Sequence, residues 1–340
     1  MKKRRTWAKV IFAFILIGII IYTFRGSWKS ILQQVADTAL PILALIAGAT
    51  VIYHLIEAWI TYSLAKLYCP AFRYRNAVCN AFCCSFYRLA TLGSGSGVAA
   101  VVYLGRHGVG YAEATGMYTI QYIIHRVSVA VFSGVTFLLN WQIMSEHYKN
   151  YAVYLILAYI LTAVICVLCI LLVIFPKFHS AVLKLARLLN FRHKYDGWIR
   201  RLEDSIVVLE QSSGILLGNA GKIVTSILKN MVKLCAWYCI PFLILLNGGQ
   251  LSFLSSVSVT SLSVMTATVI PTPAGIGSTE LIMTGLFSIM LGVDKAGAVT
   301  LLYRIATFIL PFLIGGGMIL VNRVRRHITD RKQSAARNAG

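Results

Sequence analysis

Long apolar runs alternate with short polar connections along most of this chain. Six runs reach the roughly 20 residues that a helix needs to cross a bilayer; they cover 7–24, 39–65, 112–140, 152–175, 220–247 and 297–321. None of them alternates strictly between apolar and polar positions, as a strand of a membrane barrel does. Because a chain in lipid must satisfy its backbone within helices or a closed barrel, the pattern predicts an all-α polytopic membrane protein.

Two further apolar segments, 77–104 and 251–291, are interrupted by glycine and proline. The first break reads "TLGSGSG" at 91–97, and the second reads "IPTPAGIGSTE" at 270–280. Proline removes a backbone donor and stops a helix, whereas glycine permits positive φ and close backbone approach. Each segment is therefore predicted to be a re-entrant helical hairpin or a pair of thin spans.

Basic residues are concentrated on one side of this layout. The chain has 32 Lys and Arg against 11 Asp and Glu, a formal net charge of +21. When the N-terminus is placed in the cytoplasm, the basic connections 66–76 and 176–204 and the tail after Val321 all fall inside, as the positive-inside rule requires. Segment 77–104 then begins and ends inside, and 251–291 begins and ends outside, so the two enter from opposite faces. Both termini of this multi-pass protein of the cell membrane are predicted to be cytoplasmic.

The whole chain, 1–340, is predicted to be a single membrane domain with an inverted repeat. The halves cover about 7–140 and 152–321. Each half contains an interrupted segment, a following Gly-Val pair and then an arginine in an apolar run; these are Gly108-Val109 with Arg126, and Gly292-Val293 with Arg304. Region 176–217 is predicted to form amphipathic helices in the cytoplasmic interface or on the protein's own cytoplasmic end, and 322–340 forms a basic tail. Paired interrupted segments indicate a binding site near the bilayer midplane.

Candidate binding residues lie around the two breaks. A helix that resumes near 276–278 directs free N–H groups toward an anion. Glu280 either complements the dipole of that helix or is a charged group of the cavity. Arg126 and Arg304 either pair with Glu280 or bind a lipid phosphate, which suits the guanidinium fork. The predicted substrate-binding set is Arg88, Gly95, Gly97, Arg126, Pro271, Pro273, Gly275, Gly277, Glu280 and Arg304.

Other ionisable residues in apolar runs leave more alternatives. His54 and Glu57 share a face of one span, where they either pair within the bundle or line the cavity. His125 is interpreted as a satisfied core histidine, and Lys229 and Lys233 as residues facing a cytoplasmic vestibule. The eight cysteines fall mostly inside apolar runs, as small core residues do. We find no clustered metal ligands and no catalytic motif, so no metal, cofactor or catalytic residue is predicted.

The motif "PTPAGIGSTE", followed by Gly-Val and Arg304, and the earlier Gly-rich break followed by His125-Arg126 resemble a known family. They are similar to the membrane region of the lysylphosphatidylglycerol synthase/flippase family, over about 10–325. This chain departs from the usual pattern at Ala274, where the family has glycine, and at "TLGSGSG", where it has a Pro-x-x-Gly-Glu type of break. With 19 residues from Asn322 to Gly340, the chain resembles the stand-alone members without a soluble aminoacyltransferase domain.

The resemblance implies a lipid translocase for an anionic or aminoacylated phospholipid or a polyprenyl-phosphate lipid. Rocking of the two halves would expose the site to each side. One alternative is a phosphatidylglycerol lysyltransferase that needs a partner for catalysis, and another is a scaffold in a cell-envelope pathway. The expected partners are membrane phospholipids bound through their anionic headgroups. No nucleic acid is expected, because no basic soluble module is long enough; a homo-oligomer or an envelope-enzyme partner is left open.

Overall fold

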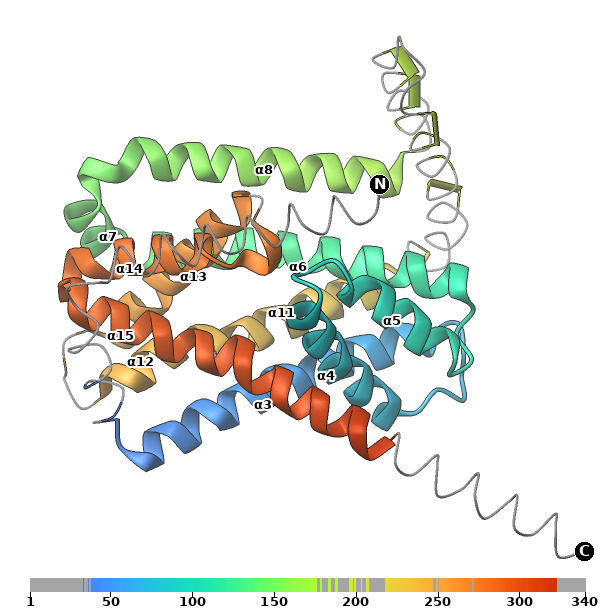
Figure 1. Ribbon diagram of the computed structural model, residues 1–340. Helices are drawn as coiled ribbons and strands as arrows, with labels where there is room; N and C mark the ends of the chain where they lie inside the picture. Colours follow the sequence, from blue (N-terminus) through green and yellow to red (C-terminus); the bar gives the residue numbers. More distant parts are fainter. Residues whose placement is uncertain are drawn as a thin grey trace, which may run out of the picture.

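The computed structural model describes residues 38–175, 218–246, 249, 251–270 and 272–322, with isolated positions at 33, 36 and between 178 and 207. Within these residues every regular element is a helix (Figure 1). Six helical stretches are long and apolar enough to cross a membrane: Leu40–Ala65, Tyr111–Leu139, Lys149–Leu171, Gly221–Leu245, Pro273–Leu291 and Val293–Asn322. The prediction of an all-α polytopic membrane protein is confirmed. The predicted span 7–24, most of region 176–217 and the tail beyond Asn322 lie outside the described residues.

Three predicted spans form single helices close to their predicted bounds: α3 (Leu40–Ala65), α6 (Tyr111–Leu139) and α8 (Ala152–Ile174). A short helix, α7 (Trp141–His147), and a 3-10 turn, η1 (Lys149–Tyr151), join α6 to α8. The span predicted at 220–247 is divided into α11 (Ala220–Tyr238) and α12 (Ile240–Leu245), because a proline in the first turn of α12 starts a new helix.

The last span begins earlier than expected. Helix α15 (Val293–Arg304) follows directly after Gly292, four residues before the predicted start at 297. It continues through a π-helical turn, η4 (Ile305–Ile309), and helix resumes to Asn322. Gly292 has a φ of +77°, which allows the chain to reverse within a single residue.

Each interrupted segment is a helical hairpin. The first consists of α4 (Tyr74–Ala90) and α5 (Ser96–Gly105); the second consists of α13 (Phe253–Val269), the 3-10 turn η3 (Pro273–Gly275) and α14 (Ser278–Leu291). Figure 1 shows that α4 and α5 extend inward from the end of the molecule where α6 begins, whereas α13 and α14 extend inward from the end where α15 begins. The two hairpins therefore point toward each other.

The two breaks have the same backbone pattern and touch. Leu92 and Ala274 are the described non-glycine residues with positive φ, at +50° and +57°, and each precedes a glycine with positive φ, Gly93 at +88° and Gly275 at +73°. A Cβ added to Gly93 would lie 2.9 Å from the backbone nitrogen of Ala274. The tips of the hairpins thus meet backbone to backbone.

Substituting alanine for Gly93 is expected to destabilise the protein. The left-handed conformation costs an L-residue about 1–2 kcal/mol, and the new methyl group would also press on the backbone of Ala274. The matched control is Gly48→Ala in α3, where an added Cβ meets nothing within 4 Å and helix propensity favours alanine. Thermal unfolding in detergent checks the pair; equal melting temperatures for both variants would contradict the contact between the tips.

Small polar residues pack α13 into the centre of the bundle. Ser258 Oγ donates to the Thr136 carbonyl oxygen at 2.9 Å, and Ser261 Oγ lies 2.9 Å from Thr136 Oγ1. Asn140 Nδ2 donates to Ser255 Oγ at 3.2 Å. Such residues allow close approach of helix backbones and hydrogen-bond between helices, which replaces the hydrophobic driving force that lipid does not supply. They hold the second hairpin firmly against α6.

The last span packs on α4 through glycine. A Cβ added to Gly315 would overlap the carbonyl oxygen of Phe82, and the rings of Phe86 and Phe312 stack with centroids 4.9 Å apart. The absence of a side chain at Gly315 therefore allows the two backbones to come together. Through this contact, the first hairpin is attached to the last span of the second repeat.

The orientation of the molecule stays a prediction, and it has a direct test. We expect cysteines introduced at Ser145, in α7, and at Gln333, in the tail, to react with a membrane-impermeant maleimide from opposite sides of the membrane. Intact cells report the outer side, and permeabilised cells report both sides. The unsubstituted chain measures labelling of the native cysteines. Labelling of both positions in intact cells would contradict the positive-inside assignment.

Candidate polar cavity

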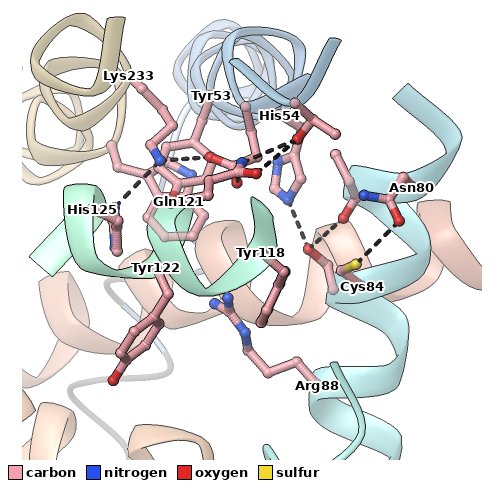
Figure 2. Close-up of a pocket in the computed structure, with 15 residues that line it drawn as sticks. Tyr53, His54, Asn80, Cys84, Arg88, Tyr118, Gln121, Tyr122, His125 and Lys233 are labelled. Carbon is pink, nitrogen blue, oxygen red and sulfur yellow. Dashed lines mark hydrogen bonds and ion pairs between the residues drawn. The ribbon is translucent and has the colours of Figure 1, made fainter. Parts of the chain in front are cut away.

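A polar cavity of about 90 Å³ lies between α3, α4, α6 and α11, enough for several water molecules (Figure 2). Each helix contributes at least one ionisable side chain. The lining residues are Tyr53, His54, Glu57, Thr61, Asn80, Ala81, Cys84, Ser85, Arg88, Tyr118, Gln121, Tyr122, His125, Lys233 and Trp237. Ionisable groups at this depth are costly in lipid, so their convergence indicates a functional site.

An ion pair occupies the part of the cavity near α11. Lys233 Nζ lies 2.6 Å from Glu57 Oε2, and the Lys233 side chain is only 2% exposed. Gln121 Nε2 donates to the other carboxylate oxygen of Glu57 at 2.7 Å and lies 3.0 Å from Thr61 Oγ1. Of the two roles left open for Glu57, the structure shows both: it pairs within the bundle and it lines the cavity.

Two histidines border this ion pair. Lys233 Nζ also lies 3.3 Å from His125 Nδ1, and because an ammonium has no lone pair, His125 accepts there. His54 Nδ1 donates to the Thr50 carbonyl oxygen at 2.9 Å, which leaves its Nε2 facing Ser85 Oγ at 2.9 Å. Both histidines line the cavity: both ring nitrogens of His54 have partners, and His125 is bonded to Lys233.

A second cavity, also of about 90 Å³, adjoins the first on the side of the second repeat. Both cavities include Arg88, His125 and Trp237 in their walls. Ala274, at the tip of the second hairpin, also contributes to the wall. The remaining lining residues are Leu234, Tyr238, Val264, Thr279, Tyr303, Arg304, Thr307 and Phe308. We call the first cavity chamber A and the second chamber B.

Glu280 connects the break of the second hairpin to chamber B. It is the third residue of α14, and its Oε2 accepts from the backbone N–H of Gly277 at 2.8 Å, so it caps the helix. Its Oε1 accepts from Arg304 Nε at 2.7 Å, with the two side chains 17% and 13% exposed. Glu280 thus caps α14 and is the counter-charge of Arg304, which lines chamber B, although Glu280 itself is not in the lining.

Arg304 retains an unused donor. Its Nη2 is buried and has no hydrogen-bond partner among the described residues, although its guanidinium group lies 4.2 Å from the ring centroid of Phe308. Arg304 is the last α-helical residue before the π-helical turn η4. Single π turns are frequent at functional sites. The geometry therefore presents a buried guanidinium edge toward chamber B.

Arg88 stands where the two chambers meet. Its side chain is exposed, and no carboxylate of the described residues lies within ion-pair distance of it. Figure 2 shows the side chain extending from α4 toward Tyr118 and Tyr122 of α6. The two chambers are lined by the cations Arg88, Lys233 and Arg304 and by the carboxylate Glu57, and Glu280, which is outside both linings, pairs with Arg304. With both histidines neutral, the site has one positive charge in excess and favours an anion.

The other predicted site residues lie at varying distances from the chambers. Arg126 is outside both linings, and its Nε donates to Tyr122 Oη at 2.9 Å. Gly95 N–H donates to Thr91 Oγ1 at 2.6 Å, and a Cβ at Gly97 would lie 3.0 Å from the Tyr118 ring. In the second break, Pro273 begins η3, and Gly275 and Gly277 have positive φ as predicted. Pro271 lies outside the described residues.

Gln121, Tyr118 and Lys233 line the site but were not in the predicted set. For Lys233 the sequence did contain a signal, since a lysine deep in an apolar run is costly unless it has a partner. Lys229, one turn earlier on α11, lies outside the chambers; its Nζ is 4.3 Å from the ring centroid of Trp59 and donates to Ser63 Oγ at 3.2 Å. The expected vestibule position therefore suits Lys229 better than Lys233.

Comparison with known proteins gives two results. The family described as "Lysylphosphatidylglycerol synthase TM region" matches residues 7–315, nearly the whole chain. The chain is also similar to UPF0104 membrane protein PH1989 of Pyrococcus horikoshii, with 40% identity over 84 residues. That second match spans 24% of this chain and 25% of the relative.

Proposed function

Because this chain belongs to the family of lysylphosphatidylglycerol synthase transmembrane regions, we propose that it moves a lipid with a phosphate-containing headgroup across the membrane through chambers A and B. The headgroup passes along the chambers while the acyl chains stay in the bilayer. The observation that carries this proposal is the free guanidinium group of Arg88 at the junction of two chambers with excess positive charge.

Two arginines account for recognition of the phosphate. Arg88 has no competing carboxylate among the described residues, and Arg304 still has the unpartnered Nη2. Guanidinium groups bind phosphate with two parallel hydrogen bonds, which an ammonium cannot reproduce. A phosphate that reaches the junction of the two chambers therefore exchanges hydrogen bonds to water for hydrogen bonds to guanidinium groups held in place by the protein.

The two carboxylates extend the range of headgroups. Glu57 lines chamber A, and Glu280 lies behind Arg304 at chamber B; each carboxylate is bound to a cation, at 2.6 Å and 2.7 Å. A headgroup that carries amines as well as a phosphate, such as an aminoacylated phosphatidylglycerol, can exchange with both ion pairs at once. This chemistry favours anionic and aminoacylated phospholipids over lipids with an uncharged headgroup.

Leaflet exchange in vesicles tests the proposal. The purified full chain is reconstituted with acyl-labelled fluorescent phosphatidylglycerol, and a membrane-impermeant reductant destroys the label in the outer leaflet only. We expect loss of the protected inner-leaflet signal with phosphatidylglycerol or its lysyl ester, and slow loss with a glycosyldiacylglycerol probe, whose uncharged sugar headgroup is too polar to cross the bilayer unaided. Protein-containing vesicles that protect the phosphatidylglycerol label as well as empty vesicles do would contradict the proposal.

A lysyltransferase acting on phosphatidylglycerol is the competing function, supported by the family description. It requires a site that admits an aminoacyl-tRNA. The two chambers lie between helices and measure about 90 Å³ each, which is far too small for such a substrate. We expect the purified chain, mixed with lysyl-tRNA and phosphatidylglycerol, to give no lysylated lipid by mass spectrometry. A full-length synthase is the positive control, and product from the purified chain would establish the transferase.

A further inference from the structure

A groove of about 630 Å³ lies on the outside of the first hairpin, separate from both chambers. Helices α4 and α5 form two of its walls, and the end of the last span forms the third. Its lining residues are Cys83, Tyr87, Thr91, Gly95, Val98, Ala99, Val102, Tyr103, Arg106, His107, Ile319 and Asn322. None of them is a carboxylate, and the volume is in the range of sites that hold small organic ligands.

The groove is polar at one end and apolar along the wall that α5 forms. Arg106 and His107 lie just beyond α5, at the end of the molecule where α6 begins, and the His107 ring stacks on Tyr103 with centroids 4.3 Å apart. Val98, Ala99 and Val102 line the wall along α5. The inner end is at Thr91 and Gly95, in the break of the hairpin.

The length of the groove matches one leaflet. Helix α5 has 10 residues, which corresponds to about 15 Å of helix. The hydrocarbon core of a bilayer is about 30 Å thick, so one leaflet contributes about half of that. When Gly95 is near the midplane, Arg106 is at the depth of the headgroups of that leaflet.

We propose that this groove binds one acyl chain of an anionic phospholipid, with the lipid phosphate at Arg106. The exposed guanidinium group of Arg106 supplies the charge, and the apolar wall, in which Val98 is 65% exposed, accommodates the chain. Tyr87 and Thr91 line the groove near its inner end, and Arg88, which lies between them in the sequence, lines the chambers. If the function proposed above holds, the groove collects the lipid in the leaflet on the α5–α6 side before its headgroup reaches Arg88.

Photo-crosslinking separates this site from ordinary contact with the bilayer. The full chain with p-benzoylphenylalanine at Val98 is placed in equimolar phosphatidylglycerol and phosphatidylcholine of the same acyl chains, and lipid adducts are weighed by mass spectrometry. We expect about a fivefold excess of phosphatidylglycerol adducts, the preference that one interfacial arginine supplies. The control position is Leu138 on α6, which is 68% exposed and outside the groove, and should capture both lipids equally.

A charge variant completes the test. In the Val98 crosslinker background, Arg106→Gln should reduce the excess about fivefold, to equal capture. Arg75 is an exposed arginine outside the groove, so Arg75→Gln should leave the excess unchanged.

Equal capture of both lipids at Val98 would mean bulk bilayer contact only and would overturn the proposal. Crosslinks from Val98 to residues 7–24, or to a second copy of the chain, would overturn it too, because another occupant would fill the groove. Crosslinking measures binding and not transport. An excess of phosphatidylglycerol adducts at Val98 in a protein that shows no leaflet exchange would therefore support the lipid-binding groove and contradict the proposed translocase function.

Discussion

Substitution of glutamine for Arg88 is expected to abolish leaflet exchange of phosphatidylglycerol while leaving the melting temperature close to that of the unsubstituted chain. Arg88 has no ion pair among the described residues, so its removal leaves no buried charge without a partner. What disappears is the free cation at the junction of the two chambers. Hydrogen bonds to charged groups contribute about 1.5–3 kcal/mol, so the loss of Arg88 weakens phosphate binding by a factor of about ten or more and suppresses transport.

Arg126→Gln is the matched control for Arg88→Gln. Arg126 is also an arginine within an apolar run, but it lies outside both chambers and bonds to Tyr122. We expect this variant to exchange lipid at nearly the normal rate. The vesicle assay and thermal unfolding are run side by side on both proteins. Normal exchange by the Arg88 variant would place the headgroup path elsewhere.

The second large effect concerns stability. Glu280→Gln is expected to lower the free energy of unfolding by about 3–5 kcal/mol, because it leaves the buried guanidinium group of Arg304 without its counter-charge. The 2.7 Å contact and the low exposure of both side chains make this a buried ion pair. Glu146→Gln is the control, since Glu146 is exposed on α7 and has no ion pair among the described residues. Thermal and denaturant unfolding in the same detergent measure the difference.

A double variant separates stability from function at the same position. Glu280→Gln combined with Arg304→Met removes both charges, and apolar replacement of a buried pair is often neutral or stabilising. We expect the free energy of unfolding to recover and lipid exchange to be absent, because the guanidinium edge facing chamber B is missing. Recovery of both properties would show that the ion pair only holds the second hairpin in place.

The sequence was sufficient for the architecture because lipid imposes simple rules. Apolar length identifies spans, and the lysine and arginine distribution forces 77–104 and 251–291 to enter from opposite faces. The division at Pro241 was missed, because the apolar run continues through it. The start at Val293 was missed for another reason: the charged pair Asp294-Lys295 resembles a connection, but both residues lie in the first turn of α15, which begins directly after Gly292.

The site was less accessible to sequence reasoning. Helix periodicity identifies which face of a helix a residue occupies, but not which helix that face meets. Glu57 and Lys233, which are 176 positions apart, therefore could not be paired in advance, and the partner of Glu280 stayed open between Arg126 and Arg304. Glycine and proline chemistry, by contrast, is local, so the positive φ of Gly275 and Gly277 was predictable.

The glycine contact between the last span and α4 limits how the molecule can move. At Gly315 the two backbones are too close to admit even a methyl group, and the ring stack of Phe86 and Phe312 lies beside it. The two halves are thus packed together at this point, and a rotation of one half against the other as two rigid bodies would break this contact. Motion that keeps it intact moves α4 and the end of the last span together as one block. The hinges then fall at the left-handed pairs Leu92-Gly93 and Ala274-Gly275, and the moving parts are the short inner arms, α5 and α14.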